Sequence, residues 1–294
     1  MNFFLVFVFI ASSLLSGCST DEKPKLKLIA NSWIGYSPLF YARETGQLSE
    51  LGIDLVHVVS LGESVNLFKS GIGQGFTGTQ FEYDKAKSRS KNLVPVILFN
   101  RSNGGDMILG NQPIEAYTST DAKISAFLEI DSVNQLLLIN FLNENGINKQ
   151  RVIFINKDQA HISTLDAKNL DELTLISTYS PYDSILEKRG FNELGSTKDS
   201  QSLLILDALY VDKTLLMDHS ERFSQLQEMM INAFTIFKTN PEKYYQVVNP
   251  YLGFESFNDF MLAADDIIWL ISSVTEDEMS IIKQSRLPTE YLIK

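Results

Sequence analysis

The sequence predicts an α/β protein, and three observations support this fold class. Apolar, β-rich runs alternate with helix-like segments along most of the chain, as in residues 53–59 followed by 61–70. Single helices between strands favour parallel βαβ units. The chain has 294 residues, of which 44% are hydrophobic and 21% charged, enough for one large core or two smaller ones.

Strands are expected where short apolar or alternating runs occur, at residues 26–30, 53–59, 94–99, 123–128, 152–155, 173–177 and 203–211. Helix starts follow several of them. Ser37 is expected to cap a helix that has Pro38 at its first position. Capping-box spacings begin at Ser60 and at Ser132, and Gly71 is placed to end the first of these two helices.

The C-terminal part of the chain changes character. After residue 212 apolar side chains recur at helical spacing, and Pro241, Pro250 and Pro288 divide the segment. The pattern predicts an all-helical tail whose aromatic stripe packs into a core.

Charge and cysteine content exclude several classes of function. The net charge is −11, whereas a protein that binds nucleic acid needs a basic face, so no nucleic-acid partner is expected. The only cysteine, Cys18, excludes an internal disulfide and a multi-cysteine metal site. The three histidines lack metal-binding spacing, so we expect neither a metal nor a cofactor.

The N-terminus has the pattern of an export signal. Residues 1–15 are apolar and uncharged, too short for a membrane span but suited to a secretory signal. Leu15-Ser16-Gly17-Cys18 resembles the lipobox of bacterial lipoproteins; the alternative is a plain signal with an incidental cysteine. The resemblance implies a signal peptide at 1–17, lipidation (palmitate) of Cys18 and a tether at 18–25. The protein would then lie in the periplasm or cell envelope, lipid-anchored to the inner or outer membrane.

Seven short motifs follow one another along the mature chain: Trp33-Ile34-Gly35-Tyr36-Ser37-Pro38-Leu39, Gly52-Ile53-Asp54-Leu55-Val56, Leu67-Phe68-Lys69-Ser70-Gly71, Ser102-Asn103-Gly104-Gly105-Asp106, Pro181-Tyr182, Ser196-Thr197-Lys198-Asp199 with Asp207-Ala208-Leu209, and Asn240-Pro241-Glu242. In this order they resemble the substrate-binding proteins of ABC importers for nitrate, sulfonates, taurine and thiamine-pyrimidine precursors.

This resemblance implies the type-2 periplasmic binding protein fold, with two α/β lobes, two chain crossovers and a ligand in the cleft between them. We expect residues 26–109 and 212–294 to form lobe 1 and 110–211 to form lobe 2, with the crossovers near 110–113 and 206–212. The implied protein is a monomer with a small-molecule ligand and an ABC permease or a membrane receptor as partner.

The ligand is expected at loops that precede helices, because unpaired N–H groups at a helix start bind polar groups and α/β folds place ligands there. The candidate ligand-binding residues are Trp33, Tyr36, Pro38, Thr79, Gln80, Glu82, Ser102, Gly105, Asp106, Glu129, Ser132, Asn134, Tyr179, Tyr182 and Asp183. The four aromatic rings suit stacking on a planar or cationic ligand. For Trp33 and Tyr36 the alternative is packing inside a lobe.

The charge of these loops indicates the type of ligand. Acids dominate, namely Glu82, Asp106, Glu129, Asp131 and Asp183, whereas Arg101 is the main basic candidate. A nitrate or sulfonate site would prefer arginine. The acids favour a small cationic or nitrogen-rich ligand such as an aminopyrimidine; the alternative for each is helix capping or exposure to solvent.

The sequence therefore predicts a solute-binding lipoprotein of an ABC importer and not an enzyme. No Gly-x-Ser-x-Gly turn or Cys/His pair is present. Residues 129–134 replace the Gly-Ser-x-Ser loop of the family, so no particular substrate is carried over. A lipoprotein that signals to a membrane receptor, or an enzyme on the same fold, are the alternatives.

Overall fold

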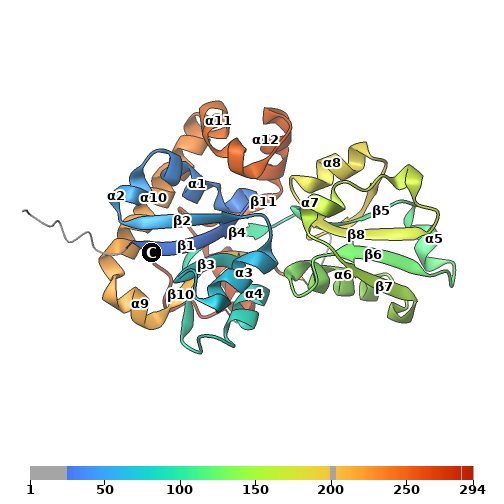
Figure 1. Ribbon diagram of the computed structural model, residues 1–294, viewed down its shortest axis with the longest axis horizontal. Coiled ribbons are helices and arrows are strands. Elements are labelled where there is room, and N and C mark those ends of the chain that lie inside the picture. The colour runs from blue at the N-terminus through green and yellow to red at the C-terminus, as the bar shows by residue number, and fades with distance from the viewer. Residues whose placement is uncertain (1–24, 199–202, 286, 294) are drawn as a thin grey trace, which may run out of the picture.

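The structure is a computed structural model that describes residues 25–198, 203–285 and 287–293. The expected signal peptide, Cys18 and the tether up to residue 24 lie outside the described residues, as does Asp199 of the sixth motif. The described chain forms two α/β lobes that lie side by side (Figure 1). No helix in these ranges is long and apolar enough to cross a membrane.

The larger lobe is built on a sheet which, within the described residues, has the strand order β11-β4-β10-β3-β1-β2. Its strands are β1 (Leu26–Asn31), β2 (Ile53–Val58), β3 (Gly75–Thr79), β4 (Leu93–Ser102), β10 (Leu206–Asp212) and β11 (Ile267–Trp269). Strand β1 is parallel to β2 and β3, whereas β10 is antiparallel to β3 and β4. Its helices are α1 (Ser37–Glu44), α2 (Gln47–Glu50), α3 (Leu61–Ser70), α4 (Gln80–Ala86), α9 (Lys213–Asp218), α10 (Ser220–Thr239), α11 (Pro241–Leu252), α12 (Phe257–Asp265) and α13 (Glu276–Gln284).

The smaller lobe has a sheet of order β7-β6-β8-β5-β9 among the described residues. Its strands are β5 (Asp106–Gly110), β6 (Ile124–Leu128), β7 (Val152–Asn156), β8 (Leu173–Tyr179) and β9 (Asn192–Ser196). Its helices are α5 (Ile114–Thr118), α6 (Val133–Glu144), α7 (Gln159–Ile162) and α8 (Tyr182–Lys188). Strand β6 is parallel to β7 and β8, and β5 is antiparallel to β8 and β9.

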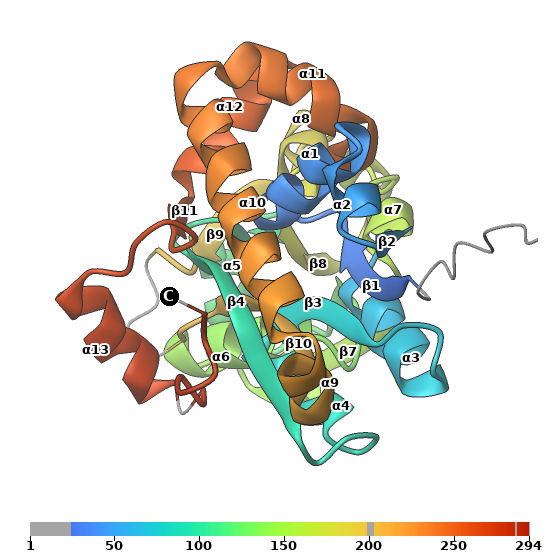
Figure 2. The same cartoon turned by 90° about the vertical axis from the view of Figure 1, so that its left-hand side faces the viewer.

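Both faces of the larger sheet are covered over β1 and β4, whose residues are buried almost throughout. Leu28 and Ile29 of β1 are both fully buried, yet they belong to different hydrophobic clusters. Successive side chains of a strand point to opposite faces, which explains the division. Helix α10 packs on one face through residues such as Phe223 and Met230. Figure 2 shows α10 running across this lobe, with α11 and α12 at one end.

Each predicted strand is found, and the helix of residues 61–70 begins and ends as expected. The Ser60 hydroxyl accepts a hydrogen bond from the N–H of Glu63 at 3.1 Å, and Gly71 has φ +88°, a conformation that glycine adopts without strain. The expected cap at Ser37 was wrong, since α1 starts at Ser37 and its hydroxyl accepts a hydrogen bond from Tyr244 at 3.0 Å.

The helical tail is interrupted by one short strand. Residues Ile267–Trp269 form β11, which pairs antiparallel with the otherwise open side of β4. The prediction of an all-helical tail was therefore wrong at this place. Three residues carry too short a pattern to reveal a strand, and their pairing partner lies far away in the sequence.

The chain changes lobe twice, a few residues before the predicted crossover positions. It leaves β4 at Ser102 and enters the smaller sheet at Asp106, and it returns between Ser196 and Leu206. The expected crossovers at 110–113 and 206–212 instead fall at the end of β5 and within β10. The sequence assigns β5 and β10 to the lobe that comes before each of them in the chain. Their true lobe depends on which strands they pair with, and a local pattern does not show this.

Candidate functional site

Polar side chains gather at one edge of the larger sheet. Asn31 ends β1, Thr79 ends β3, and Asn100 lies near the end of β4. Asp207 of the antiparallel strand β10 pairs in register with Thr79 on one side and with Asn100 on the other. The carboxyl ends of three strands therefore place amide, hydroxyl and carboxylate groups together, where α/β folds bind ligands.

The smaller lobe presents a matching edge. Asp106 begins β5 and pairs in register with Tyr179 at the end of β8, while Glu129 directly follows β6. The ring of Tyr179 lies edge-on to Trp33 of the larger lobe, with 5.9 Å between ring centroids. The two edges thus meet, and the structure describes the lobes in a closed arrangement.

Four acidic side chains are buried in the described part of the chain, and no lysine or arginine is. They are Glu82, Asp106, Glu129 and Asp207, all at the lobe interface. Burial raises the pKa of Asp106 to about 7, and the carboxylate of Glu82 adds to this rise against the opposing effect of the Ser102 hydroxyl. Burial raises the pKa of Glu129 to about 8, with Glu82 contributing. These carboxyl groups lack a basic partner and repel one another.

The remaining two acids are held by hydrogen bonds. Burial raises the pKa of Glu82 and of Asp207, although Thr79 stabilises the ionised Glu82 and Tyr36 the ionised Asp207. The Tyr36 hydroxyl donates to Asp207 and the Thr79 hydroxyl to Glu82. Glu129 accepts from the N–H of Gln159 at 3.3 Å through Oε1, which leaves its Oε2 available to a new partner.

Several buried polar atoms at the interface have no hydrogen-bond partner. These include both amide atoms of Asn31, Nδ2 of Asn100, Nδ2 of Asn134 and Oε2 of Glu129. The Tyr179 hydroxyl faces Asn31 without a well-aligned hydrogen bond. Since buried polar groups are nearly always paired in native proteins, such a concentration is typical of a site that receives a polar ligand.

The predicted aromatic residues pack on the protein itself in this arrangement. Trp33 donates from Nε1 to Oδ1 of Asn100 at 3.3 Å, and Tyr36 lies edge-on to Phe99 at 5.4 Å. Tyr182 contacts Tyr179 edge-on at 5.7 Å. Tyr36 packs inside the larger lobe, as the alternative for it expects, with its hydroxyl bonded to Asp207. Trp33 donates to Asn100 of its own lobe, but its ring also contacts Tyr179 of the smaller lobe.

Two of the helix starts expected to bind ligand, those of α4 and α6, are capped by the chain's own side chains. The carboxylate of Glu82 accepts from the N–H of Thr79 at 3.0 Å and from the N–H of Val133 at 2.9 Å. The Ser132 hydroxyl accepts from the N–H of Asn134 at 3.2 Å. The starts of α1 and α8 have no side-chain cap.

Other predicted residues hold the crossovers. The hydroxyls of Ser102 and Thr197 lie 2.8 Å apart, so the two crossovers are bonded to each other. The Gln80 side chain donates to the carbonyl of Leu204 and accepts from the N–H of Leu206 at 2.9 Å. We assign Ser102 and Gln80 to positioning of the crossovers, while Pro38 lies buried in the first turn of α1.

Gly105 marks a close approach between the first crossover and the loop after β1. A Cβ atom at this position would lie 2.7 Å from Cη2 of Trp33, closer than real contacts. Only glycine allows this approach without displacement of the indole ring.

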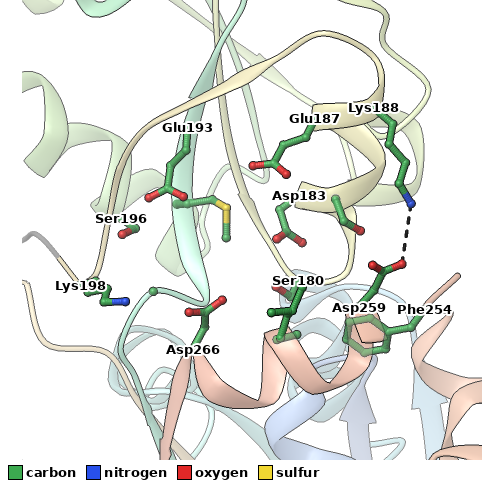
Figure 3. Close-up of a pocket in the computed structure, with 15 residues that line it drawn as sticks. Ser180, Asp183, Glu187, Lys188, Glu193, Ser196, Lys198, Phe254, Asp259 and Asp266 are labelled. Carbon is green, nitrogen blue, oxygen red and sulfur yellow. Dashed lines mark ion pairs between the residues drawn. The ribbon is translucent and has the colours of Figure 1, made fainter. Parts of the chain in front are cut away.

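Sequence reasoning missed Asn31, Asn100 and Asp207 as site residues. Each is a polar residue at the end of, or inside, a predicted apolar strand, and that combination is the signal that was available. Asp183 and Ser180 line another part of the contact region between the lobes, a pocket of about 680 Å³ to which the four buried acids do not contribute (Figure 3). No group of three or more acidic, histidine or cysteine side chains in the described ranges can hold a metal ion.

The described chain thus has two sheets, two crossovers between them and a polar interface between the lobes. The fold is that of the periplasmic binding proteins. The periplasmic aliphatic sulphonate binding protein SsuA from Escherichia coli aligns with a TM-score of 0.68 at 14% identity, covering 89% of this chain and 85% of that chain. No protein-family model matches the sequence, and neither does any curated protein sequence.

Other solved structures with this fold differ in what they bind. The ligand-binding component of an ABC-type import system from Staphylococcus aureus, with zinc bound, has a TM-score of 0.69 at 15% identity, covering 92% of this chain and 97% of that chain. The periplasmic nitrate-binding protein NrtA from Synechocystis has a TM-score of 0.63 at 14% identity, covering 80% and 68%. At these identities the likeness shows the periplasmic binding protein fold and does not identify the ligand. The ligand has to be inferred from the residues of this chain.

Proposed function

We propose that this protein is the solute-binding component of an ABC importer and that its lobes close on a small cationic or nitrogen-rich ligand, for example an amine or an aminopyrimidine. The observation that carries the proposal is the set of four buried acids with no buried lysine or arginine among the described residues. A cation supplies the missing counter-charge and lets Asp106 and Glu129 ionise. The unpaired amide group of Asn31 and the unpaired Nδ2 of Asn100 supply neutral hydrogen bonds to the same ligand.

The main basic candidate near the acidic loops, Arg101, is engaged elsewhere. Arg101 donates from Nε and Nη2 to the carboxylate of Glu278 at 3.1 and 3.0 Å. A nitrate or sulfonate would enter a region of four acids without a guanidinium to bind it. The chemistry of this interface therefore favours a ligand of opposite charge from those of the sulphonate- and nitrate-binding structures.

The proposal includes the cellular setting expected from the sequence. Export by residues 1–17 and lipidation of Cys18 would anchor a monomer in the cell envelope, with an ABC permease as partner. In cells, a Cys18→Ala variant should leave the membrane fraction; retention there would refute the anchor.

We also propose that lobe boundaries follow the sheets, with residues 26–102 and 206–293 in one lobe and 106–196 in the other.

The ligand class is tested by a thermal-shift screen of purified protein against amines, aminopyrimidines, sulfonates and amino acids. A bound ligand raises the unfolding temperature by mass action. We expect stabilisation by an amine or aminopyrimidine and its loss in Asp106→Asn. Stabilisation by sulfonates alone would refute the charge argument.

A sensor that reports to a membrane receptor is the second candidate, because lobe closure serves signalling as well as transport. Reconstitution with the cognate membrane protein separates the two, since an importer component drives ligand uptake and a sensor does not. Turnover of a bound compound by the pure protein would instead indicate an enzyme.

A further inference from the structure

An open pocket of about 680 Å³ lies beside the buried acids and is lined by both lobes. The smaller lobe contributes Asp183 and Glu187 of α8 and Glu193 of β9. The larger lobe contributes Asp259 and Asp266. Figure 3 shows the carboxylates of Asp183, Glu187, Glu193 and Asp266 directed into one space from its different sides.

The lysines of this pocket leave most of its negative charge unpaired. Lys188 pairs with Glu255 outside the lining and lies 3.7 Å from Asp259. Lys198 lowers the pKa of Asp266, yet burial together with Asp265 keeps that pKa above its ordinary value. No ion pair is found within the described ranges for Asp183, Glu187, Glu193 or Asp266.

The acids of the smaller lobe act on one another. Burial raises the pKa of Glu187, and the charges of Asp183 and Glu193 raise it further. Burial likewise raises the pKa of Asp183, with a contribution from Asp266 across the pocket. A cation in this space would relieve the repulsion between the two lobes.

A second observation, independent of charge, points to a ligand in the same place. Ser180 lines the pocket and is only 1% exposed, yet its hydroxyl has no hydrogen-bond partner. It faces Asp183, whose Oδ1 is also without a partner, but the two do not form a well-aligned hydrogen bond. A buried hydroxyl and a carboxylate oxygen are thus both available to a donor that enters the pocket.

The size and the mixed lining of the pocket point to the class of cation. The described side chains include no group that can hold a metal ion, and the pocket is far larger than a single ion needs. Met107, Phe254 and Leu262 add apolar surface to a lining that also carries carboxylates. A linear polyamine combines ammonium groups with methylene segments, which suits a lining of both kinds.

We propose that this pocket is a second binding site, separate from the buried acids at the lobe interface, and that it takes a linear polyamine. Its ammonium groups pair with Asp183, Glu187 and Glu193 of one lobe and with Asp266 of the other. A ligand that contacts both lobes favours their closed arrangement, because it binds that arrangement more tightly than an open one.

The test is isothermal titration of the purified protein with spermidine at constant ionic strength. We expect a binding event whose affinity falls at least about tenfold in a Glu187→Gln/Glu193→Gln variant, because two counter-charges are lost. A Glu115→Gln/Asp121→Asn variant removes the same charge from exposed positions on the smaller lobe and should bind spermidine normally. Melting curves of the two variants verify that both are folded.

Three results would overturn the proposal. Equal loss of affinity in both double variants would mean attraction to net charge alone. Equally strong displacement of spermidine by Mg²⁺ would mean a non-selective acidic surface. Loss of spermidine binding in Asp106→Asn, with normal binding in Glu187→Gln/Glu193→Gln, would assign the polyamine to the buried acids, and would support the proposed function while removing the second site.

Discussion

Glu82 of the larger lobe accepts a hydrogen bond from the backbone N–H of Val133 in the smaller lobe, at 2.9 Å. The same carboxylate accepts from the N–H of Thr79 at 3.0 Å, so one side chain caps the starts of α4 and α6, which belong to different lobes. A carboxylate at a helix N-terminus is stabilised by the amides and by the helix dipole. Lobe closure is therefore coupled to this one buried group.

Glu82→Ala is predicted to weaken closure and stability together. The variant leaves buried N–H groups of Thr79 and Val133 without an acceptor, which costs about 2 kcal/mol or more of unfolding free energy. Urea unfolding measures the loss, and small-angle scattering should show a more extended particle. Lys85→Ala is the matched control, because Lys85 pairs with Asp131 across the lobes at 2.6 Å but both side chains are exposed. Such a pair is worth at most about 1 kcal/mol. Equal effects of the two substitutions would contradict the role given to Glu82.

The buried acids predict an unusual dependence of stability on pH. Burial raises the pKa of Asp106 to about 7 and that of Glu129 to about 8, above their values in the unfolded chain. The folded state then binds more protons than the unfolded state from about pH 4 to about pH 8, so the unfolding free energy of the ligand-free protein falls as pH rises through this range. Urea unfolding at a series of pH values measures the slope. Asp106→Asn should flatten this slope, and the exposed Asp131→Asn should leave it unchanged. A free energy of unfolding that rises with pH over this range would contradict the raised pKa values of Asp106 and Glu129.

Cation binding at the interface is predicted to release protons. A cationic ligand favours the ionised forms of Asp106 and Glu129, so affinity should increase as pH rises through about 7 and 8. Titration calorimetry in two buffers of different ionisation enthalpy counts the released protons directly. A ligand that binds more tightly at acidic pH, or without proton release, would exclude these two carboxyl groups as its partners.

Gly105→Ala is predicted to disturb the contact between the first crossover and Trp33. The added Cβ would lie 2.7 Å from Cη2 of Trp33, and overpacking of this kind costs about 1–3 kcal/mol. The measurement is the free energy of unfolding, together with the intrinsic fluorescence of Trp33 in a Trp269→Phe background. Gly62→Ala is the control, since a Cβ there meets no atom within 4 Å. Equal effects of Gly105→Ala and Gly62→Ala on the free energy of unfolding would show that the close approach between Gly105 and Trp33 does not affect stability.

The predicted strands and the Ser60 cap were recoverable from sequence because they depend on near neighbours. Residues 53–59 form a mostly apolar run, which is a local signal for a strand. Ser60 stands three residues before Glu63, so the helix cap lies within one helical turn. Strand β3, Gly75–Thr79, shows no apolar or alternating pattern in the sequence, because two of its five residues are glycine. Its place in the sheet follows from pairing with β1 and β10, which are distant in the chain.

The candidate site was only partly predictable for the same reason. The acidic loops were visible, and three of the acids named from them, Glu82, Asp106 and Glu129, are buried together. The fourth buried acid, Asp207, became a site residue only when β10 inserted between β3 and β4. Ser102 stays a predicted ligand contact, and the structure adds its hydrogen bond to Thr197 of the other crossover, which no local pattern indicates.

The sequence alone determined the α/β class, most strands, several helix ends and the excess of acids over bases in the loops, because each depends on residue type and short-range spacing. The tertiary structure alone decided which lobe β5 and β10 join, which acids lose contact with water, and which helix-start amides are already occupied. Those outcomes depend on contacts between residues far apart in the chain. Burial and the like charge of Glu82, neither of which is visible in a local pattern, raise the pKa of Asp106 and of Glu129.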